Sequence, residues 1–167
     1  MIPYLLLLAL GLAALVQVSL LPTLSVAGVS PNLTLMLVTA WALLRGARSA
    51  VIWALVAGLW LDLLSGQWFG AYTLGLVAAA YLGGLASQTV YRPTIGLAVA
   101  MGAAVTVVQT GIQLALLLLG GGTISLPDTL LRSVAPEIVY NSIVMLAAYP
   151  VLSWINQRTG QERLPLE

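Results

Sequence analysis

The chain is a series of long apolar runs separated by short breaks that contain polar residues, glycine or proline. A helix needs about 20 apolar residues, at a rise of about 1.5 Å each, to cross the roughly 30 Å hydrocarbon core of a membrane. By this measure the pattern predicts six membrane-spanning helices, at residues 2–21, 31–44, 49–64, 68–91, 95–119 and 137–155. The sequence therefore predicts an all-α integral membrane protein with a single transmembrane domain, residues 1–155, and a polar tail at residues 156–167.

The orientation of this six-helix bundle follows from its arginines. Basic loops stay on the cytoplasmic side of a membrane. With six spans, one side of the membrane receives Arg45, Arg48, Arg92, Arg158 and Arg163, and the other receives only Arg132. We therefore expect both termini and the tail to be cytoplasmic. A five-span arrangement separates the arginines less cleanly.

Composition narrows the chemistry that this bundle can carry. Of the 167 residues, 60% are hydrophobic and 7% are charged, and the mean hydropathy is +1.04. The chain has no histidine, cysteine or lysine, which excludes imidazole and thiolate metal sites, disulfides, Cys or His nucleophiles and Schiff bases. We expect neither a cofactor nor a bound metal. A formal net charge of +1 without a basic run also argues against nucleic acid as a partner.

One acidic residue, Asp62, lies within an apolar stretch near the predicted outer end of the third helix. A carboxylate costs less there than at the bilayer centre. Ser65 is placed to cap the fourth helix, whose free N–H groups attract Asp62, and Arg132 on the same side is a candidate ion-pair partner. Three interpretations follow for Asp62: a polar elbow joining two helices, a surface recognised by a partner together with Ser65, or a catalytic aspartate.

A polar stripe follows the fifth predicted helix. Thr106, Gln109, Thr110 and Gln113 are spaced i, i+3, i+4 and i+7, so they share one face. Polar side chains in a membrane turn toward other helices or a hydrated cavity. The stripe therefore predicts either interhelical hydrogen bonds or the lining of a ligand or proton path.

Four short motifs occur in order between residues 28 and 90: Ser30-Pro31-Asn32-Leu33, Leu44-Arg45-Gly46, Gly58-Leu-x-Leu-Asp62-x-x-Ser65-Gly66-x-x-x-Gly70 and Tyr81-Leu-x-Gly84. Together they resemble MreD, the rod shape-determining membrane protein family of bacteria. Three positions depart from the family pattern, because Trp60, Trp68 and Phe69 stand where smaller aliphatic residues are expected.

The resemblance implies a non-enzymatic scaffold of the cell-elongation machinery in the bacterial cytoplasmic (inner) membrane, where it supports lateral peptidoglycan synthesis. Its implied direct partner is MreC, which has one span and a large extracytoplasmic part. MreB, RodA and a class B penicillin-binding protein belong to the same complex, and membrane lipid surrounds it. The implied fold is similar to the S-components of energy-coupling-factor transporters. The motif positions that the resemblance assigns to structure or partner contact, none of them catalytic, are Pro31, Asn32, Arg45, Gly46, Gly58, Asp62, Ser65, Gly66 and Gly70.

Other functions compete with this interpretation. A membrane-embedded small-molecule-binding subunit of a transporter would need a polar pocket, for which Gln109, Gln113 and Asn141 are the candidate lining. An intramembrane aspartyl peptidase would need a carboxylate pair. Asp62 and Asp128 lack the neighbours of such a pair, so we set this class aside. The small-residue spacings are also compatible with a homodimer.

Overall fold

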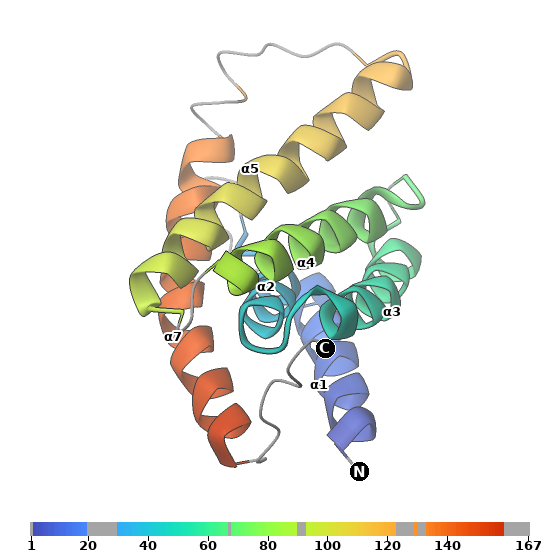
Figure 1. The fold of residues 1–167 in the computed structure, drawn as a ribbon. Helices are drawn as coiled ribbons and strands as arrows, with labels where there is room; N and C mark the ends of the chain where they lie inside the picture. The colour runs from blue at the N-terminus through green and yellow to red at the C-terminus, as the bar shows by residue number, and fades with distance from the viewer. Residues whose placement is uncertain are drawn as a thin grey trace.

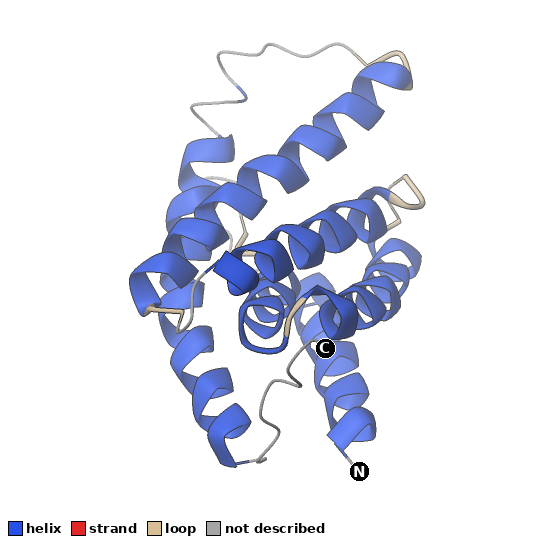
Figure 2. Cartoon of the chain, in the orientation of Figure 1, coloured by secondary structure: helices blue, strands red, loops and turns tan. Residues whose placement is uncertain are grey.

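A computed structural model describes residues 2–19, 30–66, 68–89, 93–122, 129 and 133–158 of the chain. Within these residues the regular elements are helices and no strand occurs, which confirms the predicted all-α class (Figures 1 and 2). The helices are α1 (Ile2–Ser19), α2 (Leu33–Arg45), α3 (Ala47–Ser65), α4 (Ala71–Thr89), α5 (Ile95–Leu119) and α7 (Ala135–Arg158).

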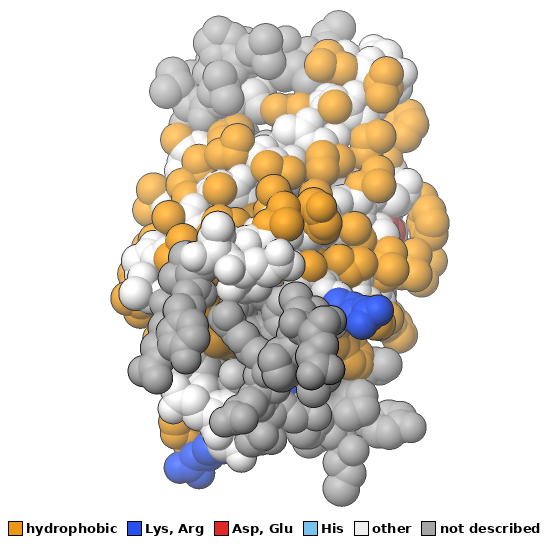
Figure 3. All heavy atoms as spheres, in the orientation of Figure 1, with side chains coloured by type: hydrophobic (Ala, Val, Ile, Leu, Met, Phe, Trp, Pro, Cys, Tyr) orange, Lys and Arg blue, Asp and Glu red, His pale blue; other side chains and the backbone are white. Residues whose placement is uncertain are grey.

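The surface of the bundle is that of a membrane protein. Among the described helices, α3, α5 and α7 are long and apolar enough to cross a membrane, and α2 is a shorter apolar helix. Large hydrophobic side chains stand on the outside of α3, α5 and α7, and Figure 3 shows apolar side chains over much of the visible face. A water-soluble domain of this size would bury most of these side chains. Such an apolar surface is stable in contact with the lipid of a bilayer.

Helix α2 forms the centre of the bundle. It contacts α1, α3, α4, α5 and α7, and Figure 1 shows it encircled by the other helices. Most of its residues are buried, including the polar Thr34 and Thr39. Protein rather than lipid surrounds α2, so it does not need the length of a lipid-exposed span. This explains why the second apolar run of the sequence is short.

Helices α3 and α4 pack most extensively, and glycine permits their close approach at both ends. A Cβ atom at Gly58 of α3 would lie 2.5 Å from the Cα atom of Thr73 in α4. At the other end, a Cβ atom at Gly84 of α4 would lie 2.4 Å from the Cα atom of Ala47 in α3. Small residues let helix backbones approach in this way in membrane bundles. The two glycines therefore fix α3 and α4 as one tightly packed pair.

The break between α2 and α3 is shorter than the sequence predicts, whereas the break between α3 and α4 is longer. Gly46, with φ at 86°, is the only residue between α2 and α3, so Arg45 ends one helix and Arg48 lies in the first turn of the next. At the start of α2, the N-cap is Asn32 rather than Ser30. The helix predicted to begin at residue 31 therefore begins two residues later, at Leu33, and the Asn32 side chain caps it by accepting from the N–H of Leu35.

Candidate functional site

Asp62 stabilises the connection between α3 and α4, which we call the elbow and whose described residues are Gly66, Trp68, Phe69 and Gly70. The residue lies in the last turn of α3 and is 4% exposed. Its carboxylate accepts hydrogen bonds from the backbone N–H groups of Tyr72 (2.9 Å) and Thr73 (3.2 Å) and from the Thr73 hydroxyl. The N–H groups of a first helical turn have no partner within their own helix. Asp62 therefore caps α4 from the preceding helix, which confirms the expected attraction between this carboxylate and the fourth helix.

The backbone of the elbow depends on two glycines. Gly66 ends α3 in the left-handed conformation, with φ at 63°, and Gly70 precedes α4 with φ at 97°. Side chains rarely adopt positive φ, and a left-handed glycine commonly terminates a helix. A Cβ atom at either position would have nothing within 4 Å. The backbone conformation, and not a lack of space, therefore favours glycine at both positions.

Two further predictions concern the elbow: a helix cap at Ser65 and an ion pair between Asp62 and Arg132. Ser65 is the last residue of α3, and α4 begins only at Ala71. The prediction that Ser65 caps the fourth helix is therefore wrong, because Asp62 reaches the free N–H groups of α4 instead. The ion pair expected between Asp62 and Arg132 lies outside the described residues.

A second group of polar contacts converges on Asn32, which directly follows Pro31 and is 6% exposed. The Asn32 side-chain oxygen accepts from the N–H of Leu35 (3.0 Å) and from the amide of Gln17 (2.9 Å). The backbone N–H of Asn32 donates to the Asn141 side chain (2.7 Å). Asn141 in turn donates to the Thr106 hydroxyl (2.9 Å). Asn32 thus joins α1, α2 and α7 directly, and α5 through Asn141.

Gln17 is part of this network and was not singled out in the sequence. Besides donating to Asn32, its side chain accepts from the backbone N–H of Thr34 (2.9 Å). A signal was present, because Gln17 is the one amide side chain within the first apolar run. An isolated amide in a membrane span commonly marks a contact between helices.

The polar stripe of α5 divides into two lines of side chains. Thr106 and Thr110 face α7, where Thr110 donates to the carboxylate of Glu137 (3.0 Å) and Thr106 accepts from Asn141. Gln109 and Gln113 face α4. For the threonine line, interhelical hydrogen bonding is the role that the contacts show.

The glutamine line has a different environment. Gln109 is completely buried, and neither polar atom of its amide has a partner among the described residues. It lies against α4 at Gly75, where a Cβ atom would stand 1.6 Å from the Gln109 side-chain oxygen. One turn further along α5, Gln113 lies near Tyr72 of α4. The α4–α5 contact therefore contains an amide whose hydrogen-bonding capacity the described residues leave unused.

The opposite end of the bundle is organised around Arg45. Its guanidinium lies 5.1 Å from the centre of the Trp41 ring and donates to the Asn156 side chain of α7. The Trp41 indole N–H donates to the Ser49 hydroxyl (3.2 Å). Together with Gly46, these contacts fasten the α2–α3 turn to the end of α7. The Leu44-Arg45-Gly46 motif therefore stabilises the α2–α3 turn at one end of the bundle, as the elbow motif stabilises the α3–α4 connection at the opposite end.

The described charged residues separate by sign along the bundle. Arg48 lies near the start of α3 and Asp62 near its end, while Glu137 lies at the start of α7 and Arg158 at its end. The Arg45–Asn156 contact shows that the arginine ends of α3 and α7 coincide. Figure 3 shows arginine side chains in the lower half of the molecule. Among the described residues, one end of the bundle is thus basic and the other acidic.

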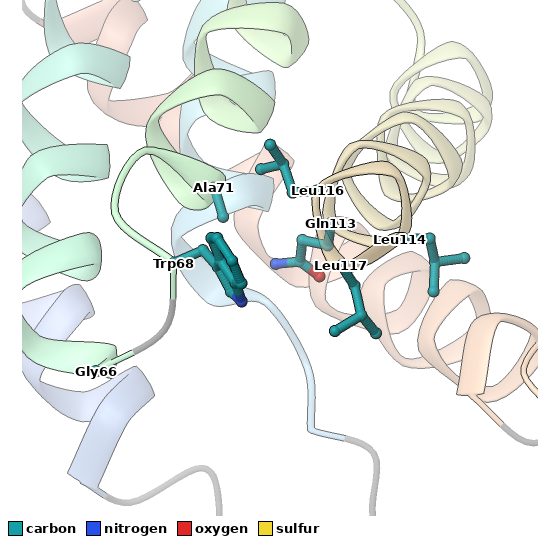
Figure 4. Close-up of a pocket in the computed structure, with 7 residues that line it drawn as sticks. All are labelled: Gly66, Trp68, Ala71, Gln113, Leu114, Leu116 and Leu117. Carbon is teal, nitrogen blue, oxygen red and sulfur yellow. The ribbon is translucent and has the colours of Figure 1, made fainter. Parts of the chain in front are cut away.

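An open pocket of about 630 Å³ lies beside the elbow, between it and α5. It is lined by Gly66 and Trp68 of the elbow, Ala71 of α4, and Gln113, Leu116 and Leu117 of α5. Figure 4 shows the Trp68 indole and the Gln113 side chain projecting into the same space from opposite sides. Among the described residues, no group of three or more acidic side chains is placed to hold a metal ion.

These features define an α-helical integral membrane protein in which buried polar side chains mainly join its own helices. The chain matches the family model of the rod shape-determining protein MreD over residues 1–158, and it belongs to this family. The comparison with curated proteins found no significant match, and neither did the comparison with solved structures. The family match confirms the resemblance seen at residues 28–90 and extends it through α5 and α7. The protein is therefore a rod shape-determining membrane protein.

Proposed function

We propose that this protein is a non-enzymatic scaffold of the bacterial cell-elongation machinery. In this role it binds MreC directly and supports lateral peptidoglycan synthesis in a complex with MreB, RodA and a class B penicillin-binding protein. The observation that carries the proposal is the environment of Asp62, whose buried carboxylate uses both oxygens to cap α4. Asp62, the acidic residue of the motif, therefore has a structural role in joining α3 to α4, as expected for a scaffold.

The proposed setting is the cytoplasmic (inner) membrane, with six spans and both termini in the cytoplasm. The separation of charge supports this orientation, because Arg45, Arg48 and Arg158 gather at one end of the described bundle. The positive-inside rule places that end in the cytoplasm. The elbow at Asp62 then faces outward, on the side of the extracytoplasmic part of MreC. The proposed six-helix bundle is similar to the S-components of energy-coupling-factor transporters.

We propose that MreC meets the outer end of α3 and the elbow. Asp62 is too buried to be the contact itself, but its neighbours are not: Leu63 and Phe69 are each 70% exposed, and Trp60 is 46% exposed. A single-span partner approaches through lipid, where helices associate by van der Waals packing against complementary side chains. The motif residues Gly58, Asp62 and Gly66 would act indirectly, by fixing the shape of this apolar surface.

Co-purification from detergent with the MreC partner tests the proposal. We expect Leu63→Ala and Phe69→Ala to weaken recovery of MreC, because they remove the protruding contacts without changing the elbow backbone. Ile143→Ala and Val151→Ala are matched controls, since both side chains are 57% exposed on α7. Recovery of MreC should be unchanged in the controls.

Two further variants separate the contact surface from its support. Asp62→Leu and Gly66→Leu should reduce recovery of MreC by deforming the elbow. If the complex survives both substitutions unchanged, the elbow is not the interface. If the unaltered chain recovers no MreC at all, the scaffold proposal itself is wrong.

A further inference from the structure

The basic end of α7 carries an arginine whose guanidinium is held in place by an aromatic ring. Arg158 is the last residue of α7 and is exposed, and its Cζ atom lies 4.0 Å from the centre of the Trp154 ring. Among the described residues, its guanidinium has no hydrogen-bond or ion-pair partner. A guanidinium offers five N–H donors in a rigid plane. These donors are therefore oriented by the ring and remain available to a ligand.

The other described arginines differ from Arg158 in this respect. Arg45 is only partly exposed, and its guanidinium already donates to the Asn156 side chain. Arg48 is exposed at the start of α3, but no aromatic ring of the described residues orients it. Arg158 is therefore the described arginine that combines exposure with a fixed orientation.

The face of α7 that leads to Arg158 is apolar and exposed. Val151, Trp154 and Ile155 precede Arg158 at i, i+3 and i+4 along a stripe that Arg158 completes at i+7, so the four side chains share one face. All four are exposed, and Figure 1 shows the last turns of α7 at the edge of the bundle. No helix among the described residues covers this face.

The depth of these residues in the membrane follows from the contact of α7 with α2. Asn156 accepts from Arg45, the last residue of α2, so the last turn of α7 lies level with the basic boundary of the bundle. Val151 lies five residues earlier, about 7.5 Å closer to the middle of the membrane along the helix. Tryptophan is typical of the boundary itself. Charge thus stands at the boundary and apolar surface lies on its hydrocarbon side, which is the order of headgroup and acyl chains in a phospholipid.

Charge decides which headgroup this face accepts. The described carboxylates, Asp62 and Glu137, lie at the opposite end of α3 and α7. They do not neutralise Arg158, so an anionic headgroup is attracted. A zwitterionic headgroup also carries a cationic group, and no described acidic side chain stands at this end to receive it. A phosphate group matches the guanidinium closely, because two of its oxygens accept from two parallel N–H groups.

We propose that the exposed face of α7 formed by Val151, Trp154, Ile155 and Arg158 binds an anionic phospholipid from the leaflet at the basic end. The phosphate accepts from Arg158, and an acyl chain lies along Val151 and Ile155 toward the middle of the membrane. Trp154 holds the guanidinium at the level of the headgroups. This site does not depend on the proposed binding of MreC, which is placed at the opposite end of the bundle.

Native mass spectrometry of the full chain, released from a non-ionic detergent, tests the proposal with dioleoylphosphatidylglycerol as the probe. We expect one molecule to be retained tightly per chain. Dioleoylphosphatidylcholine, dioleoylglycerol and inorganic phosphate, tested at the same concentration, should be retained much more weakly. Equal retention of the phosphatidylcholine would overturn the preference for an anion, and equal retention of dioleoylglycerol would show a site for acyl chains alone. Equal retention of inorganic phosphate would show a site for a water-soluble anion.

Two arginine variants separate a site from a general effect of charge. Arg158→Gln should weaken retention of the probe about tenfold, which corresponds to about 1.4 kcal/mol. Arg48→Gln removes the same charge from an exposed position at the same end and should leave retention unchanged. Equal losses in the two variants would show that only net charge matters. Unchanged retention in Arg158→Gln, with helix content equal to that of the unaltered chain, would refute the site.

Variants of the ring test the orientation of the guanidinium. Trp154→Leu keeps an apolar side chain but removes the stacking, and it should weaken retention about threefold, which corresponds to about 0.65 kcal/mol. Trp154→Phe keeps a ring and should retain most of the binding. Arg158→Lys keeps the charge without the planar donors, so its retention should fall between those of the unaltered chain and Arg158→Gln. Full retention in both Trp154→Leu and Arg158→Lys would contradict a stacked guanidinium as the phosphate ligand.

Discussion

Replacement of Asp62 by alanine should destabilise the first turn of α4. The substitution leaves three donors without their acceptor: two backbone N–H groups and the Thr73 hydroxyl. The hydroxyl can rotate toward another acceptor. The two N–H groups have none at the first turn of a helix.

The expected loss of stability follows from the backbone N–H groups of Tyr72 and Thr73. A hydrogen bond to a charged acceptor contributes about 1.5–3 kcal/mol, so the loss of two of them in Asp62→Ala should lower the free energy of unfolding by at least about 3 kcal/mol. Asp62→Asn keeps one acceptor oxygen and should lose about half of that amount. Unfolding in mixed micelles, followed by far-ultraviolet circular dichroism, measures both values. Gln88→Ala is the control, because Gln88 is exposed on the same helix. A change below about 0.5 kcal/mol for Asp62→Ala would refute the capping role.

The remaining predictions use the same unfolding assay. A double-mutant cycle between Thr106→Val and Asn141→Ala should give a coupling of at least about 0.6 kcal/mol, and additive losses would contradict the hydrogen bond from the Asn141 amide to the Thr106 hydroxyl. Gly84→Ala should destabilise by about 1–3 kcal/mol because its Cβ would overlap the facing helix, whereas Gly111→Ala, with nothing within 4 Å, should be neutral or stabilising. Gln109→Leu should leave stability unchanged or raise it, since the amide has no partner among the described residues, and a loss above about 1 kcal/mol would reveal one.

The sequence predicts helix positions well, because apolar runs and their breaks are local features. The largest differences from the observed ends are three residues, at the start of α4 (71 against 68) and at the end of α7 (158 against 155). The attraction of Asp62 to the fourth helix was also predictable, since the two are separated by one short elbow. The wrong assignment of Ser65 arose from placing the start of α4 too early.

Contacts between distant segments were beyond the reach of sequence patterns. The bond between Asn32 and Asn141 joins residues 109 positions apart, and no periodicity indicates which helices meet. The polar stripe on α5 shows the same limit. Its spacing identifies one polar face, but only the packing reveals that Thr106 and Thr110 serve α7 while Gln109 faces Gly75 on α4.

Site-specific photocrosslinking in the membrane tests the proposed scaffold role most directly. A photoreactive amino acid placed at Leu63, at the exposed outer end of α3, should form a covalent adduct with MreC. The same amino acid at Ile143, on the exposed face of α7, should not. An adduct from position 143 without one from position 63, or no adduct from either, would contradict binding of MreC at the elbow.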